Sequence, residues 1–427
     1  MESKSASAVN SLTAFTSPYM LATILLLSGF FSLFLVNSFG WRQGALFSVG
    51  LSAGVILYHA AFGFTSAWRE VVRTGRGAGL RAQMIMLALT VLVFTPLIAQ
   101  GELFGVSLRG SVAPLNFSVV CGAFMFGLGM QLGGGCASGT LYTAGGGNTR
   151  MLITLIAFIA GSVLGTWQWP IWQDTLGLAP ISLSQSFGLV GGILISFVIF
   201  AGIWYISILY EKSRNESIIT EPRSGFSTLR GPWPLLAGAL ALVFIQVATL
   251  LLAGRPWGVT SAFALWGAKA VGSIGLDVSV WPYWSRPGPL NSLHQSIFSD
   301  VTTIMNLGII LGAAAAANLA RKFSPSVALP KKQIIAAVIG GLLLGYGARI
   351  AFGCNIGAYF SGIGKYKRIA LFDTLLDQMD DDEILSIIAH EVGHYKLKHI
   401  YSGILLSTLQ SGIMPVSYTQ MTLPTKA

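Results

Sequence analysis

Two of the three cysteines in this chain lie in a glycine-rich block that is written twice. The block Gly127, Gly129, Gly135, Cys136 and Gly139 returns with the same spacing as Gly345, Gly347, Gly353, Cys354 and Gly357. Glycine clusters weaken a helix and permit close backbone approach or positive φ. A thiol at such a break can donate a weak hydrogen bond without carrying a permanent charge. The repeat therefore predicts a site shared by two related halves.

A second duplicated segment adds hydroxyl groups. Thr65-Ser66-Ala67 corresponds to Thr260-Ser261-Ala262, and each copy precedes its glycine-cysteine block. Hydroxyls, freed N–H groups and helix N-terminal dipoles together favour a bound anion. We therefore expect an anion constriction lined by Thr65, Ser66, Thr260, Ser261, Cys136, Cys354 and the glycines at 135, 139, 353 and 357. The alternative is that the glycines serve only helix packing and the thiols are merely small.

Lys269 follows the second hydroxyl segment and would be a cation at membrane depth. Such charges are costly and tend to be functional, so Lys269 is expected to attract the anion. Snorkelling of its long side chain to the interface explains the residue equally well.

A third motif, near the C-terminus, indicates a different chemistry. His390 and His394 flank Glu391 at helical spacing. On one helix face the histidines could bind zinc, and Glu391 could act as general base for the metal-bound water. A catalytic site of this kind needs a third protein ligand, and no Asp or Glu follows Glu391. We expect no independent enzyme here, and zinc only if this fragment functions.

Composition places these motifs in a membrane protein. Hydrophobic residues make up 53% of the chain, charged residues 10%, and the mean hydropathy is +0.68. These values exclude a water-soluble globule. Because about 20 apolar residues cross a bilayer, an all-α integral membrane protein with about nine transmembrane helices is predicted. The expected spans are 18–36, 45–62, 82–100, 115–132, 151–169, 187–209, 233–253, 300–320 and 333–352.

Basic residues set the expected orientation. They gather in the loops at 69–81, 212–230 and 321–332 and not on one amphipathic face, which argues against nucleic acid and for cytoplasmic loops. The tail 1–17 is then cytoplasmic. An odd number of spans in the first half places the second half upside down. We therefore expect two inverted repeats, 18–186 and 187–363, with short broken or re-entrant segments at mid-membrane.

The repeated motifs resemble those of the YeeE/YedE family of sulfur-transport membrane proteins over about 18–363. The similar segments are Phe62 to Arg69, Gly254 to Gly258, Gly135 to Thr140, and Phe352 to Gly362. The resemblance implies uptake of thiosulfate or a related small sulfur-containing anion, passed along by S–H hydrogen bonds of Cys136 and Cys354. It also implies a bacterial-type inner membrane, no cofactor, and an unknown cytoplasmic sulfur-carrier protein as partner.

One departure from the family leaves the cargo open. Some members carry a further cysteine near the first Thr-Ser-Ala segment, where this chain has Gly63 and Phe64. Selenium-containing or other sulfur-containing cargo therefore stays an alternative to thiosulfate.

Residues 365–400 resemble a second family, the CAAX prenyl-protease zinc metallopeptidases. The similar strings run from Arg368 to Leu376 and from His394 to His399. A membrane zinc endopeptidase is therefore the alternative function, incomplete without a third ligand. The transporter-like sequence stops at Ile363, where a last helix would complete the second repeat, and 401–427 resembles an artefactual tail. We interpret the chain as a chimera of two truncated genes.

Overall fold

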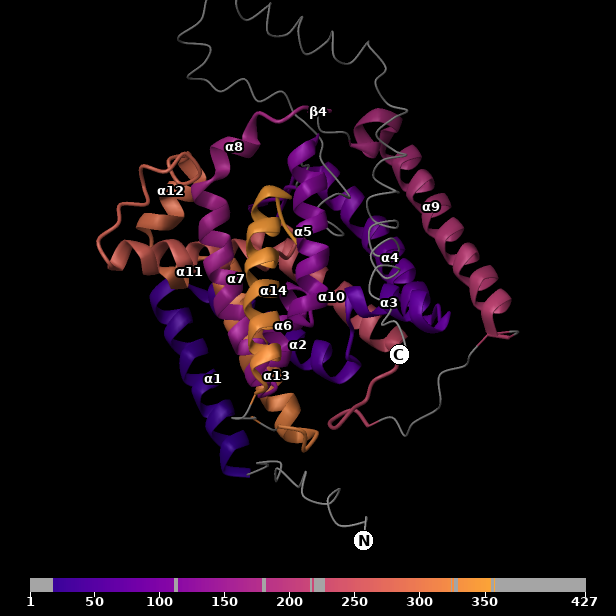
Figure 1. Cartoon of the computed structure of the whole chain (residues 1–427), viewed down its shortest axis with the longest axis horizontal. Coiled ribbons are helices and arrows are strands. Elements are labelled where there is room, and N and C mark those ends of the chain that lie inside the picture. The colour runs from indigo at the N-terminus through magenta and orange to yellow at the C-terminus, as the bar shows by residue number, and fades with distance from the viewer. Residues whose placement is uncertain are drawn as a thin grey trace, which may run out of the picture.

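The computed structural model describes residues 18–110, 114–178, 182–215, 217, 218, 227–323, 325, 329–354 and 357. Within these ranges the chain is almost entirely helical, and nine helical segments are long and apolar enough to cross a membrane (Figure 1). The predicted all-α membrane class and the nine crossings are confirmed. The segments are Pro18–Phe39, Trp41–Thr74, Ala78–Gln100, Phe117–Gly145, Thr149–Trp167, Ser186–Asn215, Leu235–Ala253, Val301–Leu319 and Lys331–Ile350.

Short helices interrupt or flank these spans in the first half of the chain. The order is α1 (Pro18–Phe39), α2 (Trp41–Ala60), α3 (Phe64–Thr74), α4 (Ala78–Gln100), α5 (Phe117–Gly133), α6 (Ala137–Gly145), α7 (Thr149–Trp167) and α8 (Trp169–Gln173). Two antiparallel pairs of two-residue strands lie at its loops: β1 (Glu102–Leu103) with β2 (Val106–Ser107), and β3 (Leu115–Asn116) with β4 (Gly177–Leu178).

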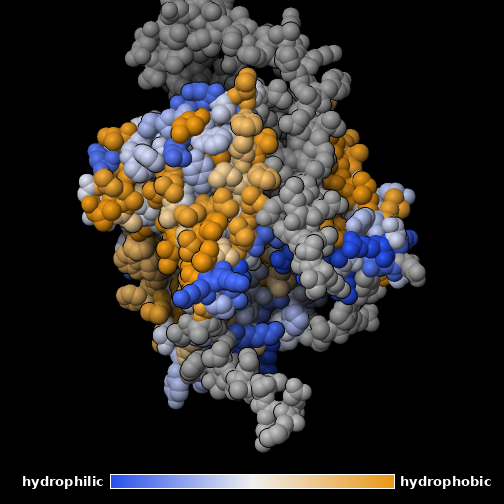
Figure 2. All heavy atoms as spheres, viewed as in Figure 1, coloured by the Kyte–Doolittle hydropathy of each residue, from blue (hydrophilic) through white to orange (hydrophobic). Residues whose placement is uncertain are grey.

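The second half follows a related order. It consists of α9 (Leu183–Asn215), α10 (Leu235–Ala253), α11 (Thr260–Ser273), α12 (Pro287–His294), the 3-10 turn η1 (Ile297–Ser299), α13 (Val301–Leu319) and α14 (Lys331–Ile350). Apolar side chains cover much of the face shown in Figure 2, and hydrophilic residues gather below them. Large apolar residues are also exposed along α1 and α9, as a lipid-facing surface requires.

Glycines bring the central helices α5 and α14 into backbone contact (Figure 1). A Cβ atom on Gly129 would lie 2.7 Å from the backbone nitrogen of Leu344, and one on Gly347 would lie 2.6 Å from the carbonyl oxygen of Gly122. Small residues permit such close approach where lipid supplies no hydrophobic force between helices. Gly129 and Gly347, which are equivalent positions of the repeated block, thus have a packing role in both copies.

The contact points show that α5 and α14 run antiparallel. The start of α5, at Gly122, lies beside Ile350 at the end of α14, whereas Gly133 at the end of α5 lies beside Gly340. At 1.5 Å per residue, Gly340 and Ile350 are separated by about 15 Å along the helix axis. The two helix ends that precede the cysteines therefore lie toward opposite ends of the pair.

A buried ion pair ties α4 to α9. The Glu211 carboxylate has no exposed surface and accepts hydrogen bonds from Arg81 Nη1 at 2.6 Å and from the Gly77 backbone N–H at 3.2 Å. Removing one partner of a buried pair leaves an uncompensated charge, at a cost of about 3–5 kcal/mol.

Glu211→Ala is therefore expected to lower the melting temperature of the purified protein in detergent. Glu102→Ala is the control, because Glu102 is exposed in β1. Equal melting temperatures for the two variants would show that the pair contributes nothing to stability.

Candidate functional site

Cys136 lies at a break between α5 and α6. The break begins at Gly134, whose φ of 91° is a left-handed conformation that glycine adopts without strain. Cys136 then caps α6, is 5% exposed, and has its Sγ atom 3.5 Å from the Ser138 hydroxyl oxygen. Its carbonyl accepts hydrogen bonds from the Thr140 N–H at 2.8 Å and the Thr140 hydroxyl at 2.9 Å. The first thiol is therefore buried and held beside hydroxyl groups.

Of the first hydroxyl segment, the structure places Thr65 next to this break. The Thr65 hydroxyl donates to Met130 Sδ at 2.8 Å, and the Met130 carbonyl accepts the N–H of Gly134 at 3.1 Å. Ser66 is instead exposed and donates to the Gly63 carbonyl at 2.9 Å within its own segment. Thr65, but not Ser66, therefore belongs to the surroundings of the first cysteine break.

Gly135 and Gly139 leave space at the first break. A Cβ on Gly139 would lie 3.5 Å from the Cys136 Sγ atom, and a Cβ on Gly135 would lie 3.5 Å from the carbonyl carbon of Gly139. Both distances are ordinary van der Waals contacts, unlike the backbone contacts at Gly129. Packing alone therefore does not account for these two glycines.

Cys354 follows α14 in the same way that Cys136 follows α5. Gly353 before it has a φ of 155°, and the Cys354 side chain is 4% exposed within the main hydrophobic core. Gly357, the last described residue, has open space where a Cβ would lie. Neither Cys136 nor Cys354 takes part in a disulfide in the described ranges. They form two separate cysteine breaks, one after each central helix.

The second hydroxyl segment, at the start of α11, is joined to two arginines. Thr260 accepts a hydrogen bond from Arg349 Nη2 at 3.0 Å. Ser261 donates to the Thr302 hydroxyl at 3.0 Å, and the same hydroxyl accepts from Arg255 Nη2 at 3.2 Å. The Thr260 hydroxyl is thus hydrogen-bonded to α14 and the Ser261 hydroxyl to α13.

Arg349 was not among the predicted site residues. It lies in the last turn of α14, five positions before Cys354, and is 7% exposed. Its Nη1 donates to the Tyr283 hydroxyl at 2.9 Å, and its buried Nε has no hydrogen-bond partner in the described structure. The sequence signal that could have found it is a single cation at the end of an apolar span.

Lys269 lies toward the opposite end of α11 from Thr260. Its Nζ donates to the carbonyls of Leu293 and Gln295, both at 2.7 Å. Nine residues of α11 separate it from Thr260, which is roughly 13 Å of helix. The ammonium group of Lys269 is therefore held by carbonyls at the end of α12, and its expected attraction for the anion stays a prediction.

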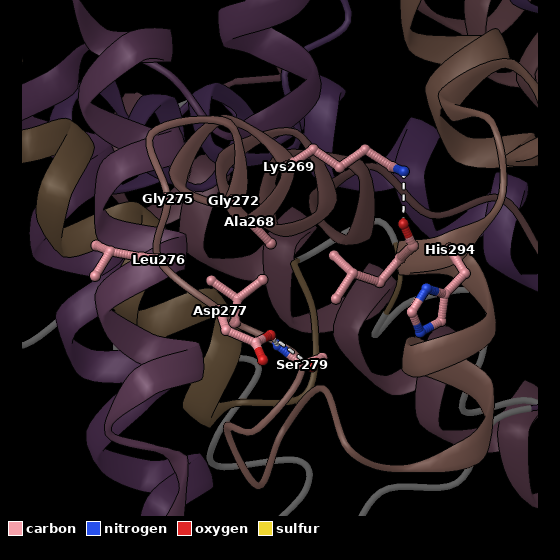
Figure 3. Close-up of a pocket in the computed structure, with 10 residues that line it drawn as sticks. Ala268, Lys269, Gly272, Gly275, Leu276, Asp277, Ser279 and His294 are labelled. Carbon is pink, nitrogen blue, oxygen red and sulfur yellow. Dashed lines mark hydrogen bonds between the residues drawn. The ribbon is translucent and has the colours of Figure 1, made fainter.

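Lys269 instead borders a surface pocket of about 420 Å³ with Asp277 and His294 (Figure 3). Ser279 donates its hydroxyl at 2.6 Å and its N–H at 3.0 Å to Asp277 Oδ1. These hydrogen bonds lower the pKa of the Asp277 carboxyl, because they favour its ionised form. The pocket therefore holds groups of both charge signs.

The zinc motif of His390, Glu391 and His394 lies outside the described residues. Among the residues that the structure does describe, no group of three metal-binding side chains is present. The structure therefore gives no test of whether these residues could hold zinc.

Comparison with known proteins finds two families in this chain, whose matches overlap at residues 351–368. The C-terminal part, residues 351–424, matches peptidase family M48. A relative there is the CAAX prenyl protease 1 homolog of Oryza sativa, 53% identical over 60 residues, which are 13% of this chain and 14% of the relative. The matched segment therefore corresponds to only a short part of the protease.

The larger part of the chain, residues 59–368, matches the family described as sulphur transport. The thiosulfate transporter TsuA of Spirochaeta thermophila is 30% identical over 330 residues, which are 74% of this chain and 89% of that protein. The thiosulfate transporter TsuA of Escherichia coli is 24% identical over 315 residues, 72% of this chain and 84% of that protein. The chain therefore belongs to the sulphur-transport family of membrane proteins.

Proposed function

We propose that this protein takes up thiosulfate or a related small sulfur-containing anion through a pathway that passes Cys136 and Cys354. The observation that carries the proposal is the placement of two buried cysteines, neither in a disulfide, each directly after a glycine break. Each break also has a threonine hydroxyl at the preceding helix turn, Thr65 beside Met130 and Thr260 beside Arg349. The likeness to thiosulfate transporters supports this cargo.

The chemistry of the breaks suits weak binding followed by release. Thiols are weak hydrogen-bond donors, and hydroxyls add neutral donors, so neither holds an anion as tightly as a fixed charge would. The helix ends before the two breaks are offset by about 15 Å along the helix axis. A small anion would therefore meet the thiols one after the other, as in a relay, and no cofactor takes part.

The packing also supports the inverted-repeat organisation, with repeats 18–186 and 187–363. The equivalent helices α5 and α14 are antiparallel, and in each half the threonine meets the last turn of that half's own glycine helix. We propose a multi-pass protein of a bacterial-type inner membrane with a cytoplasmic N-terminus. The cytoplasmic loops follow the positive-inside distribution of basic residues, and a sulfur-carrier protein would receive the cargo there.

The test is uptake of ³⁵S-labelled thiosulfate by cells that lack their own thiosulfate uptake and express the full chain. We expect saturable accumulation above empty-vector cells. Unlabelled sulfite, sulfate and selenite, added as competitors, identify the preferred cargo. Accumulation equal to that of empty-vector cells would contradict the proposed function.

The match of residues 351–424 to a peptidase family favours a second candidate, a membrane zinc endopeptidase. It predicts stoichiometric zinc on the purified chain and cleavage of a prenylated peptide that is lost in Glu391→Gln. A purified chain without zinc would remove this candidate. We also propose that residues 365–427 are foreign to the transporter, and a continuous genomic read across codons 360–370 with a native stop codon would contradict that.

A further inference from the structure

We propose that Arg349 forms a buried subsite for a small oxyanion at the second cysteine break, together with Thr260 and Tyr283. The inference rests on the proposed function, because it assigns a charge-selecting residue to the same pathway. In this subsite the Nε–H of Arg349 donates to a charged oxygen of the anion. The ligand class is a free inorganic oxyanion such as thiosulfate or sulfate.

Arg349 is a buried charge that needs an opposite charge to offset it. Its side chain is 7% exposed, and in the described ranges only two ion pairs occur, Arg81 with Glu211 and Arg255 with Asp300. An arginine stays protonated in proteins, and a buried charge is costly unless an opposite charge offsets it. Among the described residues Arg349 therefore has no acidic partner, and a bound anion would supply the missing charge.

The guanidinium group of Arg349 has two hydrogen bonds to neutral acceptors and one N–H group without an acceptor in the described structure. Nη1 donates to the Tyr283 hydroxyl at 2.9 Å and Nη2 to the Thr260 hydroxyl at 3.0 Å. Both acceptors are neutral, so they fix the orientation of the group without cancelling its charge. The Nε–H is buried and has no partner among the described residues. Because hydrogen bonds from arginine to oxyanions are strong and directional, this free donor is suited to such a ligand.

The neighbouring helix holds the base of the side chain. A Cβ on Gly165 of α7 would lie 2.7 Å from the Arg349 Cβ, so Gly165 gives the arginine room between α7 and α14. After Arg349 the chain turns at once, since the Gly353 N–H donates to the Ala348 carbonyl at 2.9 Å. This turn places Cys354 at the same helix end as the guanidinium group.

The equivalent position in the first half is uncharged. The spacing that matches Gly129 with Gly347 matches Gln131 with Arg349. One break therefore has a fixed cation and the other has a neutral amide. One span, Val301–Leu319, separates the segment 277–299, which contains Tyr283, from the basic loop 321–332, which is expected to be cytoplasmic. The cation would therefore meet an incoming anion first, and the anion would leave past the neutral break.

Binding to the purified full chain tests the subsite directly. We expect the melting temperature in detergent to rise with sodium thiosulfate above its value in sodium chloride of equal ionic strength. Arg349→Gln should lose this rise, and Arg349→Lys should keep part of it, because lysine retains the charge but lacks the Nε–H. Arg109→Gln is the matched control, since Arg109 is an exposed arginine outside the site, and it should keep the full rise.

Transport kinetics separate this inference from the proposed function. In cells, Arg349→Gln should raise the KM for thiosulfate about tenfold or more, the loss expected for a charged hydrogen bond, at matched expression. An unchanged KM in that variant would overturn the subsite and leave the transporter standing. An Arg349-dependent rise in melting temperature without any cellular uptake would keep the subsite and reject transport.

Two other outcomes would also overturn the subsite. One is a wild-type protein that no oxyanion stabilises. The other is a stabilisation that depends on Arg349 but is produced by phosphatidylglycerol added to the detergent and not by thiosulfate, which would assign the arginine to a lipid headgroup. If Arg349→Gln does not fold, the same comparisons are made with Arg349→Lys. The melting temperature of that variant should rise with thiosulfate by less than that of the wild type, and an equal rise would contradict the subsite.

Discussion

Replacing Gly345 with leucine is expected to abolish folded protein, whereas the same change at Gly127 leaves the protein folded. The two glycines are equivalent positions of the repeated block. A Cβ on Gly345 would collide with the carbonyl oxygen of Phe158 and lie 2.5 Å from the backbone nitrogen of Ser162, so α14 and α7 would have to separate. Nothing lies within 4 Å of a Cβ on Gly127. Backbone atoms cannot move aside as a flexible side chain can.

The measurement is the yield of monodisperse protein on size exclusion in mild detergent, with both variants expressed under one promoter. Gly345→Ala forms a useful intermediate step, since its single methyl group should already reduce the yield. Equal yields of Gly345→Leu and Gly127→Leu would show that the contact between α7 and α14 does not hold the fold together.

Thiosulfate uptake is expected to fall to the empty-vector level in Cys136→Ala and in Cys354→Ala. Each change removes the cysteine S–H donor of its break, while alanine keeps the small volume that the buried site requires. Because the two breaks follow different helices, one intact thiol cannot replace the other. The fold should survive, since neither thiol takes part in a disulfide.

Cys121→Ala is the matched control. Cys121 is the third free cysteine, lies within α5 and is only partly buried, so uptake should match that of the wild type. Uptake at the wild-type rate in both Cys136→Ala and Cys354→Ala would reject the cysteine pathway, even if the protein transports thiosulfate by another route.

The transmembrane helices could be predicted from the sequence because their signal is local. Span length and hydropathy alone determine which segments cross a bilayer, and the glycine cluster at 133–135 marked the break before Cys136. The break is present in the structure with a left-handed Gly134. Helix and break are both properties of a few consecutive residues, so no knowledge of distant contacts was needed.

The polar contacts of the candidate site could not be predicted in the same way. The partners of Arg349 are Tyr283, 66 residues away, and Thr260, 89 residues away, so its environment depends on how α14 packs against α11 and against the loop between α11 and α12. Lys269 was expected to attract an anion, and the structure adds that its ammonium group donates to the carbonyls of Leu293 and Gln295, which the sequence did not indicate. The sequence can therefore identify a cation within an apolar segment, but only the structure shows which groups it contacts.

The glycine contacts between α5 and α14 also restrict the motions available to the protein. Two helices whose backbones touch can neither slide nor rotate against each other without losing that contact, and α7 is joined to α14 in the same way. These three helices therefore form a rigid frame. The short helix α6 is joined to α13 in the same way, because a Cβ on Gly145 would collide with the carbonyl oxygen of Ile310. The short helices α3 and α11, which begin beside the cysteine breaks, are left as the elements able to shift. Access to the pathway would then change by small local movements against a stationary frame, not by rocking of one half of the protein against the other.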